Sequence, residues 1–149
     1  MSEPTQICKR PNLKWVTLFL AFLASAGVLA GCAGEHDRVE AKTVADRVHA
    51  HLRSAEFATI YDESAPRFKT VGSQSEFVSR MKAVQEGLGS LKGVNEIAYE
   101  TGLNSTIGRT HTLLFMLEYE HGKAREYLTL VRSATGEMQL WKMDLEPIN

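Results

Sequence analysis

Arg109-Thr-His-Thr-Leu-Leu-Phe-Met-Leu-Glu-Tyr-Glu-His121 is the stretch that decides the fold. Its side chains alternate between two faces, one carrying His111, Leu113, Phe115, Leu117, Tyr119 and His121, the other Thr110, Thr112, Leu114, Met116, Glu118 and Glu120. A period of two predicts a β-strand. We expect a two-residue turn at His121-Gly122, because glycine adopts positive φ at no steric cost.

The residues around this stretch extend the pattern into a meander. Ala124 to Arg132 returns as a strand, with Tyr127, Thr129 and Val131 on one face and Leu128 and Leu130 on the other. Val94 to Thr101 reads as a preceding strand. After a turn at residues 133–136, Gln139, Trp141, Met143 and Leu145 alternate along a last strand that we expect to end before Pro147.

The first half of the chain has helical spacing instead. Between Arg38 and Ser54 the apolar positions form one stripe, made of Ala41, Val44, Ala45, Val48 and Leu52. A shorter helix with Phe57, Ile60 and Tyr61 on its inner side should stop before Pro66, because the residue before a proline leaves the α region.

A third helix is predicted by a capping signal. Ser73 and Glu76 have the spacing of a capping box. Behind them the apolar residues of one helix face recur as Phe77, Met81, Val84 and Leu88, and Gly87 and Gly89 fit the C-terminal cap. Helices followed by an antiparallel meander predict an α+β domain, with the N-terminal helices packed on one face of a curved antiparallel sheet.

The N-terminus carries a targeting signal. Lys9, Arg10 and Lys14 precede an uncharged apolar run that ends at Leu29-Ala30-Gly31-Cys32. This segment resembles the bacterial lipobox, which implies cleavage after Gly31 and a diacylglyceryl group on the thiol of Cys32. The alternative is a transmembrane helix, but the uncharged run of about 15 residues is shorter than the roughly 20 that a span requires.

The lipobox divides the chain into a signal peptide (1–31), a lipidated Cys32 with a short polar tether (32–38) and a single domain (39–149). Loss of the peptide removes three basic residues and Glu3, so the 17 basic and 18 acidic side chains become 14 and 17. An acidic domain makes nucleic acid an unsuitable partner. The remaining cysteine, Cys8, leaves with the peptide, so the domain has no disulfide and no thiolate site.

Phe57-Ala-Thr-Ile-Tyr61, Phe68-Lys69 and the capped helix ending in Gly-Leu-Gly89 resemble the small bacterial domains of the nuclear transport factor 2-like superfamily. The resemblance covers Arg38 to Pro147 and implies a cone, in which helices fill the mouth of a bent sheet. A cystatin-like sheet around a helix is the alternative. That superfamily includes enzymes, binding domains and interaction modules, so the resemblance leaves the function open.

The polar residues form no catalytic or metal-binding set by spacing. His49 and His51 point to different sides of a helix, and His111 and His121 are ten residues apart on one strand, roughly 33 Å at strand rise. Glu118 and Glu120, with Glu126 across the hairpin, read as a solvated strand end, and the adjacent Tyr61 and Asp62 diverge on a helix. A further histidine, His36, lies in the tether. We therefore predict no catalytic residue, no metal and no cofactor.

The aromatic residues suggest where a ligand could bind. Tyr61, Tyr119, Tyr127 and Trp141 are the groups that could line a cavity in the mouth of the cone. The sequence favours a non-catalytic interaction module or accessory subunit, held at the membrane through the lipid on Cys32 and bound to an envelope protein. The alternatives are a carrier or sensor of a small apolar ligand, and an enzyme of the dehydratase or isomerase kind. Ala33 after the cysteine, rather than Asp, predicts the outer membrane facing the periplasm in a Gram-negative cell.

Overall fold

The computed structural model describes residues 29–148, with side chains from Gly34 onward. Residues 1–28 of the predicted signal peptide, and the side chains of Gly31 and Cys32, therefore lie outside the described part of the chain. A compact unit begins at His36 and runs to the C-terminus. Across the described residues, no helix combines the length and the apolar character needed to cross a membrane.

The helices occupy the first half of the compact unit, as predicted. They are α2 (Leu29–Arg53), α3 (Phe57–Glu63), the 3-10 turn η1 (Phe68–Thr70) and α4 (Gln74–Leu88). The capping box is complete, because the Ser73 side chain accepts from the Glu76 amide and the Glu76 side chain accepts from the Ser73 amide. Gly89 caps the other end with a φ of +80°.

The start of α2 differs from the prediction. The helix already includes residues 32–38, which the sequence indicated as a tether. Arg38 donates to Glu96 at 3.0 Å, and Asp37 binds Arg132. Asp37 and Arg38 thus belong to the folded domain, because their side chains are held by strands far away in the sequence.

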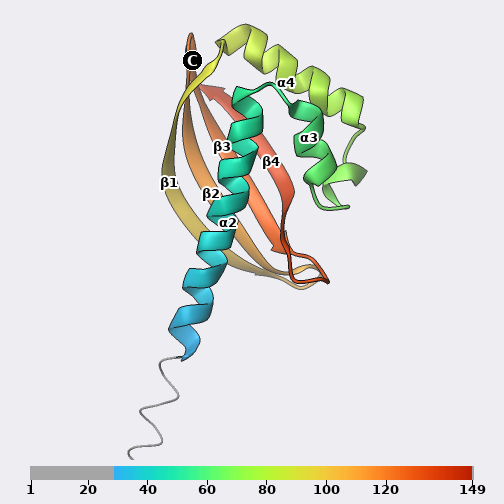
Figure 1. Cartoon of the computed structure of the whole chain (residues 1–149), viewed down its shortest axis with the longest axis vertical. Helices are drawn as coiled ribbons and strands as arrows, with labels where there is room; N and C mark the ends of the chain where they lie inside the picture. The colour runs from blue at the N-terminus through green and yellow to red at the C-terminus, as the bar shows by residue number, and fades with distance from the viewer. Residues whose placement is uncertain (1–28, 149) are drawn as a thin grey trace, which may run out of the picture. The chain divides into compact units, whose positions relative to one another are not determined.

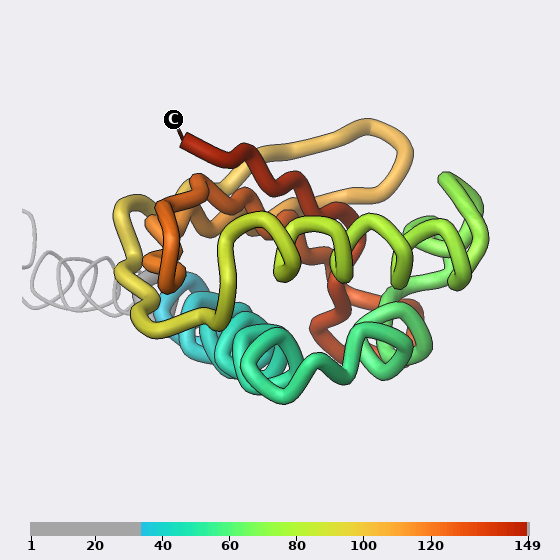
Figure 2. Tube along the Cα trace, turned by 90° about the horizontal axis from the view of Figure 1, so that it is seen from above, coloured from blue at the N-terminus to red at the C-terminus, as the bar shows by residue number. Residues whose placement is uncertain are grey.

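The second half is one antiparallel sheet in the order β1 (Leu91–Asn104), β2 (Gly108–Tyr119), β3 (Gly122–Arg132) and β4 (Met138–Ile148). The strands are long and curved, and α2 runs along them while α4 crosses near one end (Figure 1). Seen along the strands, α2 and α3 lie on the same side of the sheet (Figure 2). The predicted α+β arrangement is therefore confirmed.

The core fills the space between the helices and the sheet. The apolar stripe predicted for α2 is buried in full, and Leu113, Phe115 and Leu117 of β2 meet it from the sheet. Between Leu52, Phe57, Met81, Tyr119 and Leu145 a gap of only about 10 Å³ remains. That volume is no more than the space a single water molecule occupies.

Two turn details were predicted wrongly. The β2–β3 turn is Glu120-His121 and not His121-Gly122, since Tyr119 pairs with Gly122. Its amides are taken by the α4–β1 connection, because His121 N donates to Leu88 O and Glu120 N donates to Ser90 O. The last strand also continues through Pro147, which an edge strand tolerates because a proline there removes no ladder hydrogen bond.

Candidate functional site

An open groove of about 610 Å³ lies between the α3–η1–α4 segment and strand β4. We call it the aromatic groove; its apolar lining is Tyr61, Phe68, Phe77, Trp141 and Met143, and its charged lining includes Arg67 and Arg80. The rings of Phe68 and Phe77 pack edge to face at 5.4 Å, and the Tyr61 ring is about 6 Å from both. A groove of this size with apolar walls and a few polar groups is typical of a binding site.

Hydrogen bonds hold the helical wall of the groove in place. The Tyr61 hydroxyl donates to Gly72 O at 2.9 Å, so it ties α3 to the start of α4. Lys69 Nζ donates to Asp62 O, and Gln74 Nε2 donates to Asp62 Oδ1. Ala65 N donates to Leu140 O at 2.8 Å, which joins this wall to β4. The groove is thus formed before any partner arrives, which lowers the entropic cost of binding.

Trp141 enters the groove from an irregular point of β4. Thr129 pairs with Lys142 and Leu130 pairs with Leu140, so Trp141 is an extra residue in a β-bulge. The bulge breaks the alternation that the sequence predicted, and Met143 and Leu145 share the inner face with Leu140 instead of with Trp141. Bulges of this kind re-aim a side chain next to a site. The Trp141 indole N–H is buried without a hydrogen-bond partner in the described part of the chain.

The other two aromatic residues predicted for the cavity lie elsewhere. Tyr127 is on the outer face of the sheet, because it pairs with Leu114 and both alternate with the buried residues of their strands. Tyr119 is on the inner face, inside the core. Burial and the nearby Glu126 carboxylate raise the pKa of Tyr119 to about 12. The structure therefore brings only Tyr61 and Trp141 together.

A buried pair of polar residues was missed by the sequence analysis. His49 Nε2 lies 2.6 Å from Glu126 Oε2, and the two residues are 1% and 0% exposed. The His49 ring also packs edge to face on Phe115 at 4.6 Å. Glu126 is thus not part of a solvated strand end. The signal was its position two residues before Leu128, on the inner face of β3.

The His49–Glu126 pair has further bonding capacity but no access to solvent. Nδ1 of His49 and Oε1 of Glu126 have no hydrogen-bond partner within the described residues. Neither residue lines any of the grooves found in that part of the chain. A substrate could reach this acid and base only after the core had opened.

A second polar network lies where α2 begins. Asp37 and Glu40 both bind the guanidinium of Arg132. The hydrogen bond from Arg132 lowers the pKa of Asp37 and raises that of Arg132. His111 lies 3.8 Å from Asp37 and accepts or donates a hydrogen bond at the Tyr99 hydroxyl, 2.7 Å away, while burial lowers its pKa.

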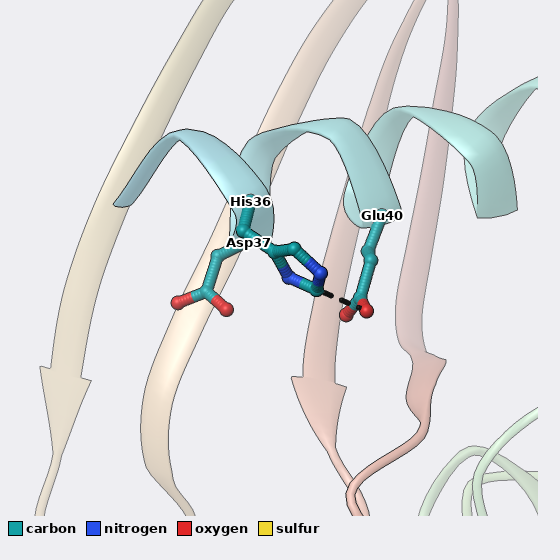
Figure 3. Close-up of side chains that lie close together, drawn as sticks. All are labelled: His36, Asp37 and Glu40. Carbon is teal, nitrogen blue, oxygen red and sulfur yellow. Dashed lines mark ion pairs between the residues drawn. The ribbon is translucent and has the colours of Figure 1, made fainter. Parts of the chain in front are cut away.

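His36, Asp37 and Glu40 come close enough together to be considered as metal ligands (Figure 3). His36 is mostly exposed and pairs with Glu40 at 3.4 Å. Since both carboxylates already neutralise Arg132, a cation here would compete with a guanidinium. The cluster is better explained as the ion-pair network that fixes the start of α2.

Comparisons with known proteins place the fold but not the function. No protein-family model and no curated protein matches the chain. A structure from Catenulispora acidiphila, solved at 2.5 Å, aligns with a TM-score of 0.56 and 11% identity, covering 77% of this chain and 94% of that one. At this identity the likeness shows a shared fold alone, the α+β arrangement of helices on a curved open sheet.

Proposed function

We propose that this protein is a cell-envelope lipoprotein whose domain binds a partner protein without catalysing a reaction. The anchor is the lipid on Cys32, for which the support is the lipobox at residues 29–32. Under this proposal a Gram-negative cell carries the domain on its outer membrane, facing the periplasm, because Ala33 follows the cysteine.

The observation that carries the binding proposal is the aromatic groove. It is open, its wall is held by the hydrogen bonds of Tyr61, Asp62 and Ala65, and it presents an exposed apolar side chain, Val71, at its rim. Exposed apolar surface with polar neighbours marks protein interaction sites. Trp141 and Arg67 also belong to the residue types enriched at such interfaces.

Two observations favour this function over the alternatives. Between Leu52, Phe57, Met81, Tyr119 and Leu145 only about 10 Å³ is left, so an apolar ligand would have to bind in an open groove and not among these core side chains. His49 and Glu126 are buried in the core, where a substrate reaches them only if the packing opens.

The anchor is tested by growing cells with an alkyne analogue of palmitate. We expect label on the wild-type chain, no label on Cys32→Ser, and unchanged labelling in Cys8→Ser, the matched control. Label that survives in Cys32→Ser would contradict the anchor.

The binding function is tested separately by crosslinking the full lipoprotein in cells and purifying it through a C-terminal tag. One dominant envelope protein at near-stoichiometric yield is expected. Recovery of the uncrosslinked chain alone, at crosslinker doses that join known envelope complexes, would overturn it.

A further inference from the structure

Strand β4 is an edge strand with free backbone groups. It is last in the sheet order, so it pairs with β3 on one side and with no described strand on the other. Within the described residues, the backbone hydrogen bond that reaches this edge from outside the sheet is the one from Ala65 N to Leu140 O, at the start of the strand. From Trp141 to Glu146 the edge has backbone N–H and C=O groups that an added strand could use, and Pro147 ends this run because it has no N–H.

The free edge faces the aromatic groove. Four consecutive residues of β4, from Trp141 to Asp144, line the groove. Successive side chains of a strand point to opposite faces of the sheet, so a groove on one face would be lined by alternate residues only. The groove therefore runs along the edge of the strand. In Figure 1 this edge lies beside α3.

Two of the three cations that line the groove, Arg67 and Arg80, have no salt-bridge partner within the described residues; the third is Lys142. Arg67 and Arg80 are exposed and form no salt bridge with any described residue. Arg80 sits over the Phe77 ring at 5.9 Å. The carboxylates nearby are already engaged, because Glu76 belongs to the capping box and Asp144 pairs with Lys142 at 2.5 Å.

In a second groove of about 640 Å³, beside α2 and the β3–β4 turn, the basic side chains do have salt-bridge partners. Its basic side chains lie beside an acid of the same groove, Arg47 at 3.8 Å and His51 at 3.7 Å from Glu63. In a domain with an excess of acidic residues, the aromatic groove thus offers two unpaired positive charges next to apolar surface and a free strand edge.

We propose that the occupant of the aromatic groove is an extended segment of a partner protein in which apolar and acidic residues alternate, bound as an added strand along β4. This inference rests on the proposed binding function. The backbone of the segment pairs with β4 beyond Leu140, alternate apolar side chains contact Val71, Trp141 and Met143, and the acidic ones meet Arg67 and Arg80. Strand addition of this kind takes affinity from main-chain hydrogen bonds and specificity from side-chain pockets.

The test uses three fluorescent heptapeptides and the full mature lipoprotein in bilayer nanodiscs. The first alternates Val and Asp, the second alternates Val and Lys, and the third is the acidic peptide with every backbone amide N-methylated, so that donors are removed from both edges of the strand. We expect the acidic peptide to bind at least about tenfold more tightly than the lysine peptide, and N-methylation to weaken it, since it removes the donors of a strand.

Charge reversal supplies the matched control. Arg67→Glu with Arg80→Glu should invert the preference between the acidic and lysine peptides. Lys82→Glu, two residues along the same helix and outside the groove, should leave it unchanged. Equal affinity for all three peptides would overturn the proposal. Oleate binding without peptide binding, or attachment to phosphatidylglycerol vesicles that depends on Arg67 and Arg80, would do so as well.

A photocrosslinking amino acid separates this inference from the function on which it rests. It is placed in cells at Val71 on the groove rim, 82% exposed, or at Leu103, 88% exposed and outside the groove. Protein crosslinks from Val71 that disappear in Arg67→Glu with Arg80→Glu support the groove. Crosslinks from Leu103 alone would refute the groove as the binding site and leave the proposed binding function intact. The absence of crosslinks from both positions would contradict both proposals.

Discussion

His49 on α2 and Glu126 on β3 form a buried hydrogen-bonded pair, with 2.6 Å between Nε2 and Oε2. This pair fixes the helix on the sheet at the centre of the core, because neither group has water as an alternative partner. Breaking a buried ion pair on one side leaves the other group uncompensated, whereas replacing both with apolar side chains is often tolerated.

The first prediction follows from this asymmetry. Glu126→Ala should lower the free energy of unfolding by roughly 3–5 kcal/mol. The double variant His49→Leu with Glu126→Leu should be more stable than Glu126→Ala, since it leaves no orphaned polar group. Urea unfolding followed by Trp141 fluorescence measures both. If the double variant were the less stable of the two, the orphaned histidine would not be the reason that Glu126→Ala is costly.

The second prediction concerns two glycines of α4 that should respond with opposite sign. A Cβ on Gly89 would lie 2.7 Å from the Cβ of Glu120, and its φ is +80°. Gly87 lies inside the helix, and a Cβ there meets nothing within 4 Å. Gly89→Ala should therefore destabilise the protein by about 1–2 kcal/mol or more, and Gly87→Ala should stabilise it by about 0.5–1 kcal/mol. Thermal unfolding of the two variants, compared with wild type, decides the signs.

The third prediction concerns the start of α4. The Ser73 side chain accepts from the Glu76 amide at 3.3 Å, while its own amide donates to Glu76 Oε2 at 2.8 Å. Ser73→Ala should cost about 1 kcal/mol of stability. Ser73→Asp keeps an acceptor at the cap and should recover most of the loss. Equal losses in both variants would show that the cap acts through something other than its acceptor.

The fourth prediction is that the free energy of unfolding falls as the pH is lowered, in part because of His111. Burial lowers the pKa of His111 below 6.5, and the opposing charge of Asp37 offsets this only in part. The unfolded chain thus takes up this proton more readily than the folded one, so the stability His111 contributes is complete above about pH 6.5 and is lost as the pH falls toward its folded pKa. The hydrogen bond from Arg132 lowers the pKa of Asp37 from 3.8, so the stability that Asp37 contributes is lost only at lower pH.

His111→Asn should therefore flatten the fall in unfolding free energy between pH 6.5 and 5 relative to wild type. Urea midpoints across this range provide the comparison. A slope that is unchanged in the variant would assign the pH dependence to another group.

The sequence predicted the elements because each has a local signal. The period of two along residues 109–121 and the capping box at Ser73 both reappear in the structure. It did not predict which polar side chains would meet, because those contacts join distant segments: His49 and Glu126 are 77 residues apart, and Asp37 and Arg132 are 95 apart. Alternation along β3 puts Glu126 on the face of Leu128, but the sequence was interpreted as a solvated strand end there, and nothing in it marks the histidine opposite Glu126.

The candidate site was predicted only in part, for a similar reason. Tyr61 and Trp141 line the same groove because a β-bulge turns Trp141 toward it. No residue near Trp141 predicts this bulge. Tyr127 lies on the outer face of the sheet. Alternation along β3 defines two sets of side chains, but it does not say which of the two sets the helices cover. No sequence motif marks Arg67 and Arg80, and only the fold sets them beside the edge of β4.

Whether a partner protein binds in the aromatic groove is decided by the yield of protein crosslinked in cells to the lipid-anchored chain with the photocrosslinking residue at Val71. We expect one dominant crosslinked protein. This crosslink should disappear when Arg67 and Arg80 are both changed to Glu, and it should remain when Lys82 is changed to Glu. The same yield in all three chains, or no protein crosslinked in any of them, would contradict this expectation.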